Sequence, residues 1–186
     1  MTRIIAGLAK GRRLDVPSTG TRPTSDKTRE AIFSRLDSWG VLEGARVLDL
    51  YAGSGALALE AISRGAQRAV LVDSSQKAAR VAKKNVVTCG FTRSVKVIAR
   101  SARSYLASQV GQFDLVFVDP PYSLGEDELS RMLEDLRPHL HAEATVIIER
   151  DARSPEPVLP EGLELFGHRR WGDTAAWFIG PAEEKM

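Results

Sequence analysis

The tetrapeptide Asp119-Pro120-Pro121-Tyr122 combines residue types that can activate an amine. The exocyclic amine of a nucleobase is a poor nucleophile because its lone pair is conjugated with the ring. It becomes reactive when two acceptors hold its N–H bonds and turn the lone pair towards an electrophile. The Asp119 carboxylate and the Pro120 carbonyl can be these acceptors, since the prolines fix the backbone and offer no competing N–H. Tyr122 can stack on an extruded base, so we expect group transfer to a nucleobase amine.

A glycine loop runs from Asp49 to Gly55 and can hold a cofactor. Its glycines, Gly53 and Gly55, let a ligand approach the backbone at the start of a helix. Asp73 follows roughly 20 residues later, where an acid can bind ribose hydroxyls. With Ala58 the glycines also satisfy the dinucleotide pattern G-x-G-x-x-A, so a nicotinamide enzyme is a rival hypothesis. Asp49 argues against it, because a carboxylate repels a pyrophosphate and attracts the ammonium and sulfonium of S-adenosylmethionine.

Apolar and amphipathic segments alternate along the middle of the chain. This alternation predicts parallel strands joined by right-handed helical crossovers, which is an α/β, doubly wound and mostly parallel sheet. Together with two C-terminal segments the sheet has seven strands. The expected strands are 46–50, 69–73, 95–99, 113–119, 145–149, 163–170 and 174–179, and the expected helices are 27–36, 56–64, 75–89, 102–109 and 126–136.

The predicted sheet places the tetrapeptide beside the glycine loop. Open sheets of this kind bind ligands at the carboxyl ends of their strands. The glycine loop follows the strand 46–50 and the tetrapeptide ends the strand 113–119, so both are expected at this edge. Two consecutive prolines after a strand, taken alone, more often make a simple turn. Their position near the glycine loop favours the chemical interpretation.

The two ends of the chain are expected to depart from this alternation. A short gap between residues 163–170 and 174–179 predicts a C-terminal antiparallel hairpin. Residues 4–14 contain two glycines and predict a short N-terminal hairpin. We therefore expect a basic arm, residues 1–20, and one catalytic domain, residues 21–186. The arm has few large apolar side chains, so we expect it to bury little surface and to be dispensable for folding and for cofactor binding.

Basic residues are concentrated in two parts of the chain, although the net charge is only +2. Residues 1–35 contain eight basic and three acidic residues, and residues 74–113 contain eight basic and no acidic residues. Stretches of one sign favour a polyanionic partner, of which nucleic acid is the leading candidate. The candidate RNA contacts are Arg3, Lys10, Arg12, Arg13, Arg22, Lys27 and Arg29.

Length and composition exclude several other classes of protein. The 186 residues suffice for one well-filled domain, and 43% hydrophobic with 27% charged residues is typical of globular proteins. We see no apolar segment long enough to span a membrane and no secretory signal, so we expect a cytoplasmic protein. A single cysteine, Cys89, and three histidines show no spacing typical of a metal site, so we expect no metal.

Three stretches of the sequence resemble one family of enzymes. They are Arg3 to Gly7 with Gly11-Arg12, Thr21 to Thr24 followed by Arg29 to Phe33, and Leu48 to Gly55 with the tetrapeptide. On these residues the chain resembles the RsmD family of 16S rRNA guanine-N2 methyltransferases, class I enzymes that use S-adenosyl-L-methionine. The resemblance implies a Rossmann-like fold and S-adenosyl-L-homocysteine as a product. It also implies that the substrate is 16S rRNA within an assembled or partly assembled small ribosomal subunit.

The resemblance further implies roles for individual residues. The four residues of the tetrapeptide would be catalytic. The glycine loop would surround the methionine part of the cofactor, Asp73 would bind its ribose, and Ser101 would lie at its adenine edge. Ser101 departs from the usual pattern, in which this position is Asp or Asn. The implied cofactor contacts are Thr24, Asp49, Tyr51, Gly53, Ser54, Gly55, Asp73, Ser74 and Ser101.

Other methyl acceptors are compatible with the same chemistry. Adenine N6 in DNA could use the tetrapeptide, but residues 151–186 are too short for a target-recognition segment. A protein glutamine is a further candidate methyl acceptor. The basic arm weighs against it, because the arm would have no evident role in binding such a substrate. A degenerate fold that only binds RNA is disfavoured by the intact tetrapeptide and Asp49. Methylation of pyrimidine C5 needs a cysteine nucleophile, whereas Cys89 is expected at the end of a helix.

Overall fold

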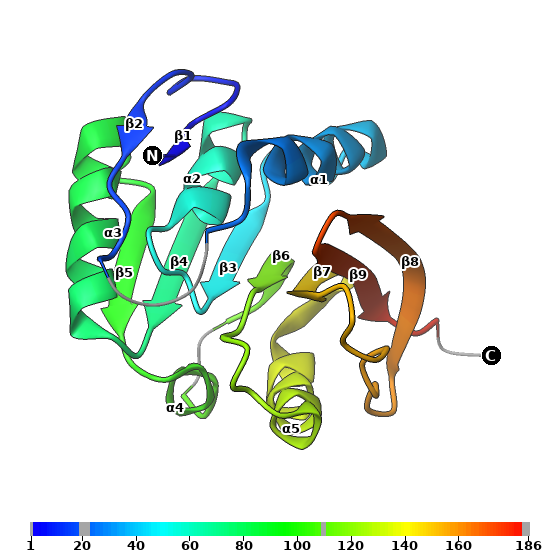
Figure 1. The fold of residues 1–186 in the computed structure, drawn as a ribbon. Coiled ribbons are helices and arrows are strands. Elements are labelled where there is room, and N and C mark those ends of the chain that lie inside the picture. Colours follow the sequence, from blue (N-terminus) through cyan, green and yellow to red (C-terminus); the bar gives the residue numbers. More distant parts are fainter. Residues whose placement is uncertain (1, 19–22, 109–110, 184–186) are drawn as a thin grey trace.

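Seven strands form one sheet at the centre of the protein (Figure 1). This computed structural model describes residues 2–18, 23–108 and 111–183. The strands lie in the order β5-β4-β3-β6-β7-β9-β8, and β3 to β7 are parallel to one another. The predicted α/β, doubly wound and mostly parallel sheet is confirmed. The strands are β3 Arg46–Leu50, β4 Arg68–Asp73, β5 Val95–Ala99, β6 Phe113–Val118, β7 Leu140–Asp151, β8 Leu163–Trp171 and β9 Thr174–Pro181.

The longer helices begin and end at residues that suit those positions. At the start of α1 the Ser25 hydroxyl accepts a hydrogen bond from the Thr28 amide, and at its end Gly40 adopts a left-handed conformation. In α3, Ser75 and Gly90 have the same roles. The helices are α1 Asp26–Trp39, α2 Ala56–Ser63, α3 Gln76–Cys89, α4 Ala102–Leu106 and α5 Glu126–Leu136, followed by the short 3-10 helix η1 Arg137–His139.

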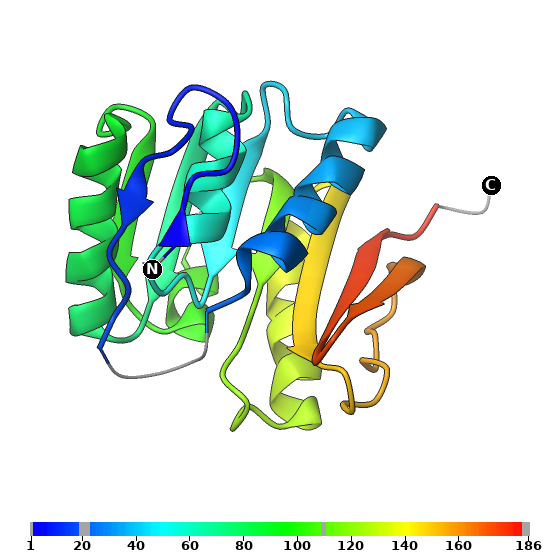
Figure 2. The same cartoon turned by 45° about the horizontal axis from the view of Figure 1, so that its top comes forward.

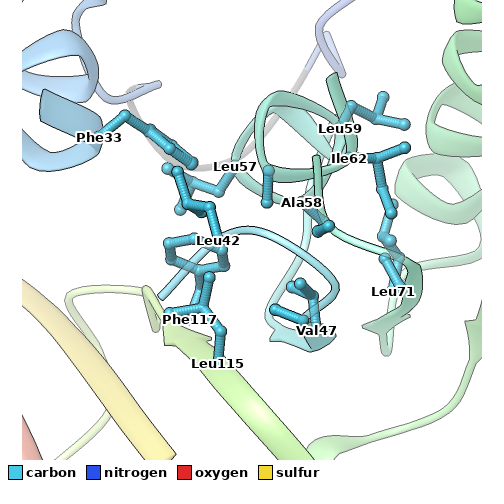
Figure 3. Packing of buried hydrophobic residues seen from close by; sticks show 14 of the residues in the cluster. Phe33, Leu42, Val47, Leu57, Ala58, Leu59, Ile62, Leu71, Leu115 and Phe117 are labelled. Atoms are coloured by element: carbon cyan, nitrogen blue, oxygen red, sulfur yellow. The ribbon is translucent and has the colours of Figure 1, made fainter. Parts of the chain in front are cut away.

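Helices cover both faces of the sheet, and each face has its own apolar core. Figure 2 shows α1, α2 and α3 on one side of the sheet and α5 on the other. The first core contains Phe33 from α1 and Phe117 from β6, among other residues drawn in Figure 3. Neighbouring residues of one strand face opposite cores, as Val47 and Leu48 do in β3. The parallel strands are therefore buried on both faces of the sheet.

Several predicted elements differ in length from the structure. The helix α1 continues to Trp39, beyond the predicted end at residue 36, and β9 continues to Pro181, beyond the predicted end at residue 179. The seventh strand of the chain, β7, has 12 residues and extends at both ends beyond the predicted 145–149. It is long because β6 pairs with it on one side and β9 on the other. The helix α4 ends at Leu106, before the predicted end at residue 109.

The predicted C-terminal hairpin is confirmed, because β8 and β9 pair antiparallel. The strand β9 lies between β7 and β8 in the sheet, and it also pairs antiparallel with β7. Asp151, near the carboxyl end of β7, pairs with Thr174 at the start of β9. The turn between β8 and β9 is therefore brought to the carboxyl edge of the parallel strands.

The N-terminal arm is part of the main core, which corrects the prediction that it buries little surface. The strands β1 Thr2–Arg3 and β2 Arg13–Leu14 pair antiparallel, as expected for a short hairpin. Ile4, Ala9 and Leu14 are 1%, 4% and 2% exposed and belong to the same apolar cluster as α1, α2 and α3. Figures 1 and 2 show the arm lying against α2 and α3.

Polar contacts also fix the arm to α2. The fully buried carboxylate of Glu60 accepts hydrogen bonds from the amides of Ile5 and Ala6, at 2.8 Å and 3.1 Å. Gly7 approaches the helix so closely that a Cβ atom there would lie 1.8 Å from the carbonyl oxygen of Ser63. Because the arm is held in this way, we now expect it to contribute to the stability of the fold, in contrast to the prediction that it is dispensable for folding.

Candidate active site

Three hollows follow one another along the carboxyl edge of the parallel strands. The central hollow, of about 270 Å³, lies at the glycine loop after β3. The outer hollow, of about 490 Å³, lies between the start of α1, the tetrapeptide and the β8–β9 turn. The side hollow, of about 250 Å³, extends towards α4 and α5. The central and outer hollows share Pro23, Thr24 and Asp119, and the central and side hollows share Tyr51, Asp73 and Ser74.

Asp49 provides a buried carboxylate in the wall of the central hollow. Its Oδ2 accepts a hydrogen bond from the Ala58 amide at 3.3 Å, whereas its Oδ1 is buried without a hydrogen-bond partner among the described residues. Burial raises the pKa of Asp49 well above its ordinary value, and repulsion from Glu149 and Asp73 adds to this effect. A buried oxygen of this kind suits a ligand that brings a positive charge or an N–H donor.

The glycine loop is shaped by close packing against its neighbours. Gly55 has a φ of +83°, and a Cβ atom there would lie 2.6 Å from Cδ2 of Leu71. The amide of Gly53 donates to Oδ2 of Asp73 at 2.9 Å, which holds the loop against the end of β4. Gly53 lines the central hollow, and nothing lies within 4 Å of the position its Cβ would take. Gly55 is buried against Leu71 and does not line the hollow, so it serves the packing of the loop, in contrast to its prediction as a cofactor contact.

The arm lines part of the central hollow, and Asn85 of α3 connects the arm to the glycine loop. The Asn85 side-chain amide donates to the carbonyl oxygens of Ser54 and Asp15, each at 2.9 Å, and so joins the glycine loop to the arm. Val16 and Pro17, which follow in the chain, line the hollow. The arm is therefore part of the wall of this hollow, in contrast to the expectation that the whole cofactor site lies beyond residue 20.

Asp73 lies at the end of β4, between the central and side hollows. Its Oδ1 accepts from the Ser75 amide at 2.8 Å and its Oδ2 from the Gly53 amide. Each carboxylate oxygen can accept more than one hydrogen bond, so ribose hydroxyls can still bind. Tyr51 lines the same two hollows and has a φ of 61°, a left-handed conformation that is uncommon outside glycine. Ser74 is exposed beside them.

Ser101 lies just after β5 in the wall of the side hollow. Its hydroxyl oxygen accepts from the Ser104 amide at 3.1 Å and caps α4. The hydroxyl retains a proton to donate, whereas an adenine amine needs an acceptor. Leu124 and Met132 supply apolar surface in the same hollow, which suits a flat ring.

Asp119 and the rest of the tetrapeptide connect the central and outer hollows. Asp119 lines both, Pro121 lines the central hollow, and Pro120 and Tyr122 line the outer one. Burial raises the pKa of Asp119 well above its ordinary value, and the nearby carboxylate of Glu149 adds to this effect. The Tyr122 residue is 67% exposed, so its ring is accessible for stacking.

Glu149 completes the polar wall of the outer hollow, and sequence reasoning did not identify it. It lies near the carboxyl end of β7 and is 3% exposed. The Thr24 hydroxyl lies 2.7 Å from Oε2 of Glu149 and 3.5 Å from Oδ2 of Asp119, so one hydroxyl lies between two carboxylates. Burial raises the pKa of Glu149 to about 7, although Thr24 and Arg29 oppose this effect. The available signal was an acid ending the apolar segment 145–149.

Most of the predicted RNA-contacting cations are exposed. Arg3, Lys10, Arg12 and Arg13 are exposed on the arm. Lys27 is exposed at the start of α1 and lines the outer hollow. The remaining predicted contact in this segment, residue 22, lies outside the described residues.

Arg29 is an internal residue, which corrects its prediction as an RNA contact. Its side chain is 1% exposed. The guanidinium donates to the Thr2 hydroxyl at 2.8 Å, to Oδ1 of Asp26 at 3.1 Å and to the Arg3 carbonyl oxygen. These bonds join α1 to β1. A guanidinium enclosed in this way serves the fold and cannot reach a phosphate outside the protein.

Residues 2–18, 23–108 and 111–183 contain neither a cluster of metal-binding side chains nor a membrane-spanning helix. No three His, Cys, Asp or Glu side chains in these ranges come together as they do around a metal ion. Within the same ranges, no helix has the length and apolar character needed to cross a bilayer.

Solved structures share this fold. The structure described as "putative methyltransferase yhhF" from Escherichia coli superposes with a TM-score of 0.85 at 32% identity, covering 96% of this chain and 97% of that one. A hypothetical protein from Thermus thermophilus superposes with a TM-score of 0.81 at 30% identity, covering 96% and 98% of the two chains. The protein thus has the Rossmann-like fold of a class I methyltransferase.

Sequence comparison assigns the chain to one family within this class. The family described as conserved hypothetical protein 95 matches residues 2–180. "Ribosomal RNA small subunit methyltransferase D" of Escherichia coli K12 is 37% identical over 175 residues, covering 93% of this chain and 86% of the relative. The protein of the same name from Haemophilus influenzae is 35% identical over 178 residues, covering 91% and 89%. The chain belongs to this family, the RsmD family of methyltransferases.

Proposed function

We propose that the protein transfers a methyl group from S-adenosylmethionine to the exocyclic N2 of a guanine in 16S rRNA. One observation carries this proposal: Asp119 lines both the central and the outer hollow. A carboxylate in this position can hold an amine from the outer hollow next to a cofactor in the central one. The names of the relatives, which are rRNA small subunit methyltransferases, support rRNA as the substrate.

The residues of the central and side hollows fit S-adenosylmethionine. Oδ1 of Asp49 is buried without a partner among the described residues and suits the ammonium of the cofactor. Asp73 can accept hydrogen bonds from ribose hydroxyls, and the side hollow beside Ser101 suits the adenine. The absence of a side chain at Gly53 leaves room in the central hollow for the chain of the cofactor. When bound, S-adenosylmethionine supplies an electrophilic methyl group.

The residues of the outer hollow orient the target base. Asp119 and the Pro120 carbonyl accept the two N–H bonds of the amine and turn its lone pair towards the central hollow. Tyr122 stacks on the base, which has left its helix or loop. Because its pKa is raised by burial, Asp119 is also suited to receive the proton that the amine loses.

Exposed cations of the arm and of α3 are proposed to bind the phosphates of the RNA. The two elements lie side by side, since Nζ of Lys84 in α3 lies 2.5 Å from Oδ2 of Asp15 in the arm. The arm cations concerned are Lys10, Arg12 and Arg13, all exposed. Small ribosomal subunits, assembled or partly assembled, are the proposed partner.

The RNA contacts can be tested by neutralising charges without removing the arm. Replacing Lys10, Arg12 and Arg13 by alanine should lower affinity for small subunits and reduce the slope of log affinity against log salt by about three. Replacing Arg68 and Arg131, which are exposed and lie outside both basic stretches, is the control. An unchanged slope in the triple variant would mean that these three residues do not contact the RNA and that other residues bind its phosphates.

The methyl acceptor can be identified directly. Purified protein and S-adenosylmethionine are incubated in separate reactions with small subunits, naked 16S rRNA or duplex DNA. The nucleosides and the proteins of each reaction are then analysed by mass spectrometry. We expect N2-methylguanosine in the rRNA reactions and none with the Asp119→Ala variant. Formation of N6-methyladenine in DNA, methylation of a protein glutamine, or RNA binding without any methylation would each replace the proposal by one of the other candidates.

A further inference from the structure

The outer hollow contains a second buried carboxylate that the proposed reaction does not use. Glu149 is 3% exposed and lines this hollow. Its Oε2 accepts from the Thr24 hydroxyl at 2.7 Å, but its Oε1 is buried without a partner in the part of the chain that the structure describes. An unpaired buried carboxylate oxygen is costly, because it has lost water and gained no donor. A ligand with an N–H group in the outer hollow would remove this cost.

The cations near Glu149 make their hydrogen bonds elsewhere. Arg150 directs its guanidinium to the Leu124 carbonyl and to Oε1 of Glu126, at 2.9 Å and 2.7 Å. Arg29 attracts the Glu149 carboxylate electrostatically, yet its hydrogen bonds go to the arm and to Asp26. Neither arginine therefore donates a hydrogen bond to the free oxygen of Glu149.

Glu149 and Asp119 are placed to act on the same base. Both carboxylates lie within 3.5 Å of the Thr24 hydroxyl oxygen. Together they present acceptors side by side in one wall of the outer hollow. A base that binds both must therefore offer two neighbouring donors.

Among the bases that carry an exocyclic amine, guanine alone has this pattern. Its N2 amine and its N1–H are adjacent donors on one edge. Adenine and cytosine place an acceptor, N1 or N3, beside the amine, and an ionised carboxylate would repel that acceptor. Two acceptors next to each other thus select guanine and reject the other two.

We propose that Glu149 accepts the N1–H of the target guanine and makes the site specific for guanine. This inference rests on the proposed function. It assigns the specificity for guanine to a second residue, Glu149, in addition to Asp119. Glu149 acts on the base edge while Asp119 holds the reacting amine. The Thr24 hydroxyl positions Glu149 by donating to its other oxygen.

The test compares guanine with 2-aminopurine at the target position. 2-Aminopurine keeps the reacting amine but has an acceptor at N1. Small subunits are reconstituted with 16S rRNA that carries either base at the nucleotide where N2-methylguanosine is found. The ratio of kcat/KM for the two substrates is measured for the wild-type protein and for Glu149→Gln at pH 8, above the Glu149 pKa of about 7, so that the carboxylate is ionised. Asp151→Asn, the same change two residues further along β7, is the matched control.

We expect the wild-type protein to prefer guanine by about 10-fold to 100-fold, the range for one hydrogen bond to a charged group. The Glu149→Gln variant should lose at least about tenfold of this preference, because a glutamine amide can donate to the N1 acceptor of 2-aminopurine and has no charge to repel it. Its affinity for S-adenosylhomocysteine should stay unchanged. Asp151→Asn should keep the wild-type ratio.

A second pair of variants keeps the test decisive if Glu149→Gln folds poorly. Thr24→Val removes the hydroxyl that positions Glu149, whereas Thr24→Ser retains it. The valine variant should lose part of the base preference and the serine variant should keep it. An unchanged ratio in folded Glu149→Gln and in Thr24→Val would overturn the inference, even if both variants were slower. If the wild-type protein forms no N2-methylguanosine, the proposed function itself fails, and the inference fails with it.

Discussion

Replacing Glu149 by glutamine should raise the free energy of unfolding of the ligand-free protein by about 3 kcal/mol at pH 8 but by only about 1 kcal/mol at pH 5. Glutamine has nearly the shape of a protonated glutamic acid and cannot ionise. It also keeps an oxygen that can accept the hydrogen bond of Thr24. The substitution therefore removes the charge of the buried side chain and preserves its packing.

The magnitude follows from the pKa of Glu149 in the folded protein. Folding raises this pKa from 4.5 to about 7, chiefly because the carboxyl is buried. Between these values the folded state keeps a proton that the unfolded state has lost, so stability decreases as the pH rises. Below pH 4.5 both states are protonated and the penalty is absent. Above pH 7 both are ionised, and the full penalty of about 3 kcal/mol remains.

Urea unfolding at pH 5 and pH 8, followed by tryptophan fluorescence, measures the effect. Asp151→Asn is the control, because the pKa of Asp151 is lowered by its hydrogen bonds with Arg153. That substitution should give no gain in stability at pH 8. If Glu149→Gln had the same effect at both pH values, or lowered stability at pH 8, the reasoning from burial would be refuted.

Three other substitutions test separate parts of the structure. Asp119→Asn should lower the rate of methylation by about 100-fold or more while affinity for S-adenosylhomocysteine, measured by calorimetry, stays nearly unchanged; full activity would contradict its role. Asp49→Asn should weaken binding of the same ligand by about 10-fold to 100-fold, because the buried charge that attracts the ammonium is lost. Wild-type affinity in this variant would mean that the ammonium of the cofactor does not bind at Asp49. Leu14→Ala should lower stability by about 2 to 5 kcal/mol, whereas Leu8→Ala, at a residue 87% exposed, should change it little; equal effects would mean that the arm does not pack as described.

The features that depend on local sequence were predictable. The strands β3, β4, β5 and β6 lie within one residue of their predicted bounds because short apolar segments between turn residues identify a buried strand. The glycine loop and the tetrapeptide were identified because their chemistry is carried by neighbouring residues. Their common edge followed from the rule that parallel strands end on the same side of a sheet.

Tertiary structure alone decided which distant residues meet. Glu149 and Thr24 are 125 positions apart, and they touch because β7 lies next to β6 and the start of α1 covers that edge. Arginine is usually exposed, yet Arg29 is buried, because the arm folds back and supplies acceptors for its guanidinium. The burial of Leu14 likewise depends on helices far along the chain. The spacing of apolar residues in the sequence predicts which face of a helix or strand is buried. The burial of a charged residue depends instead on hydrogen-bond partners that only the folded chain brings together.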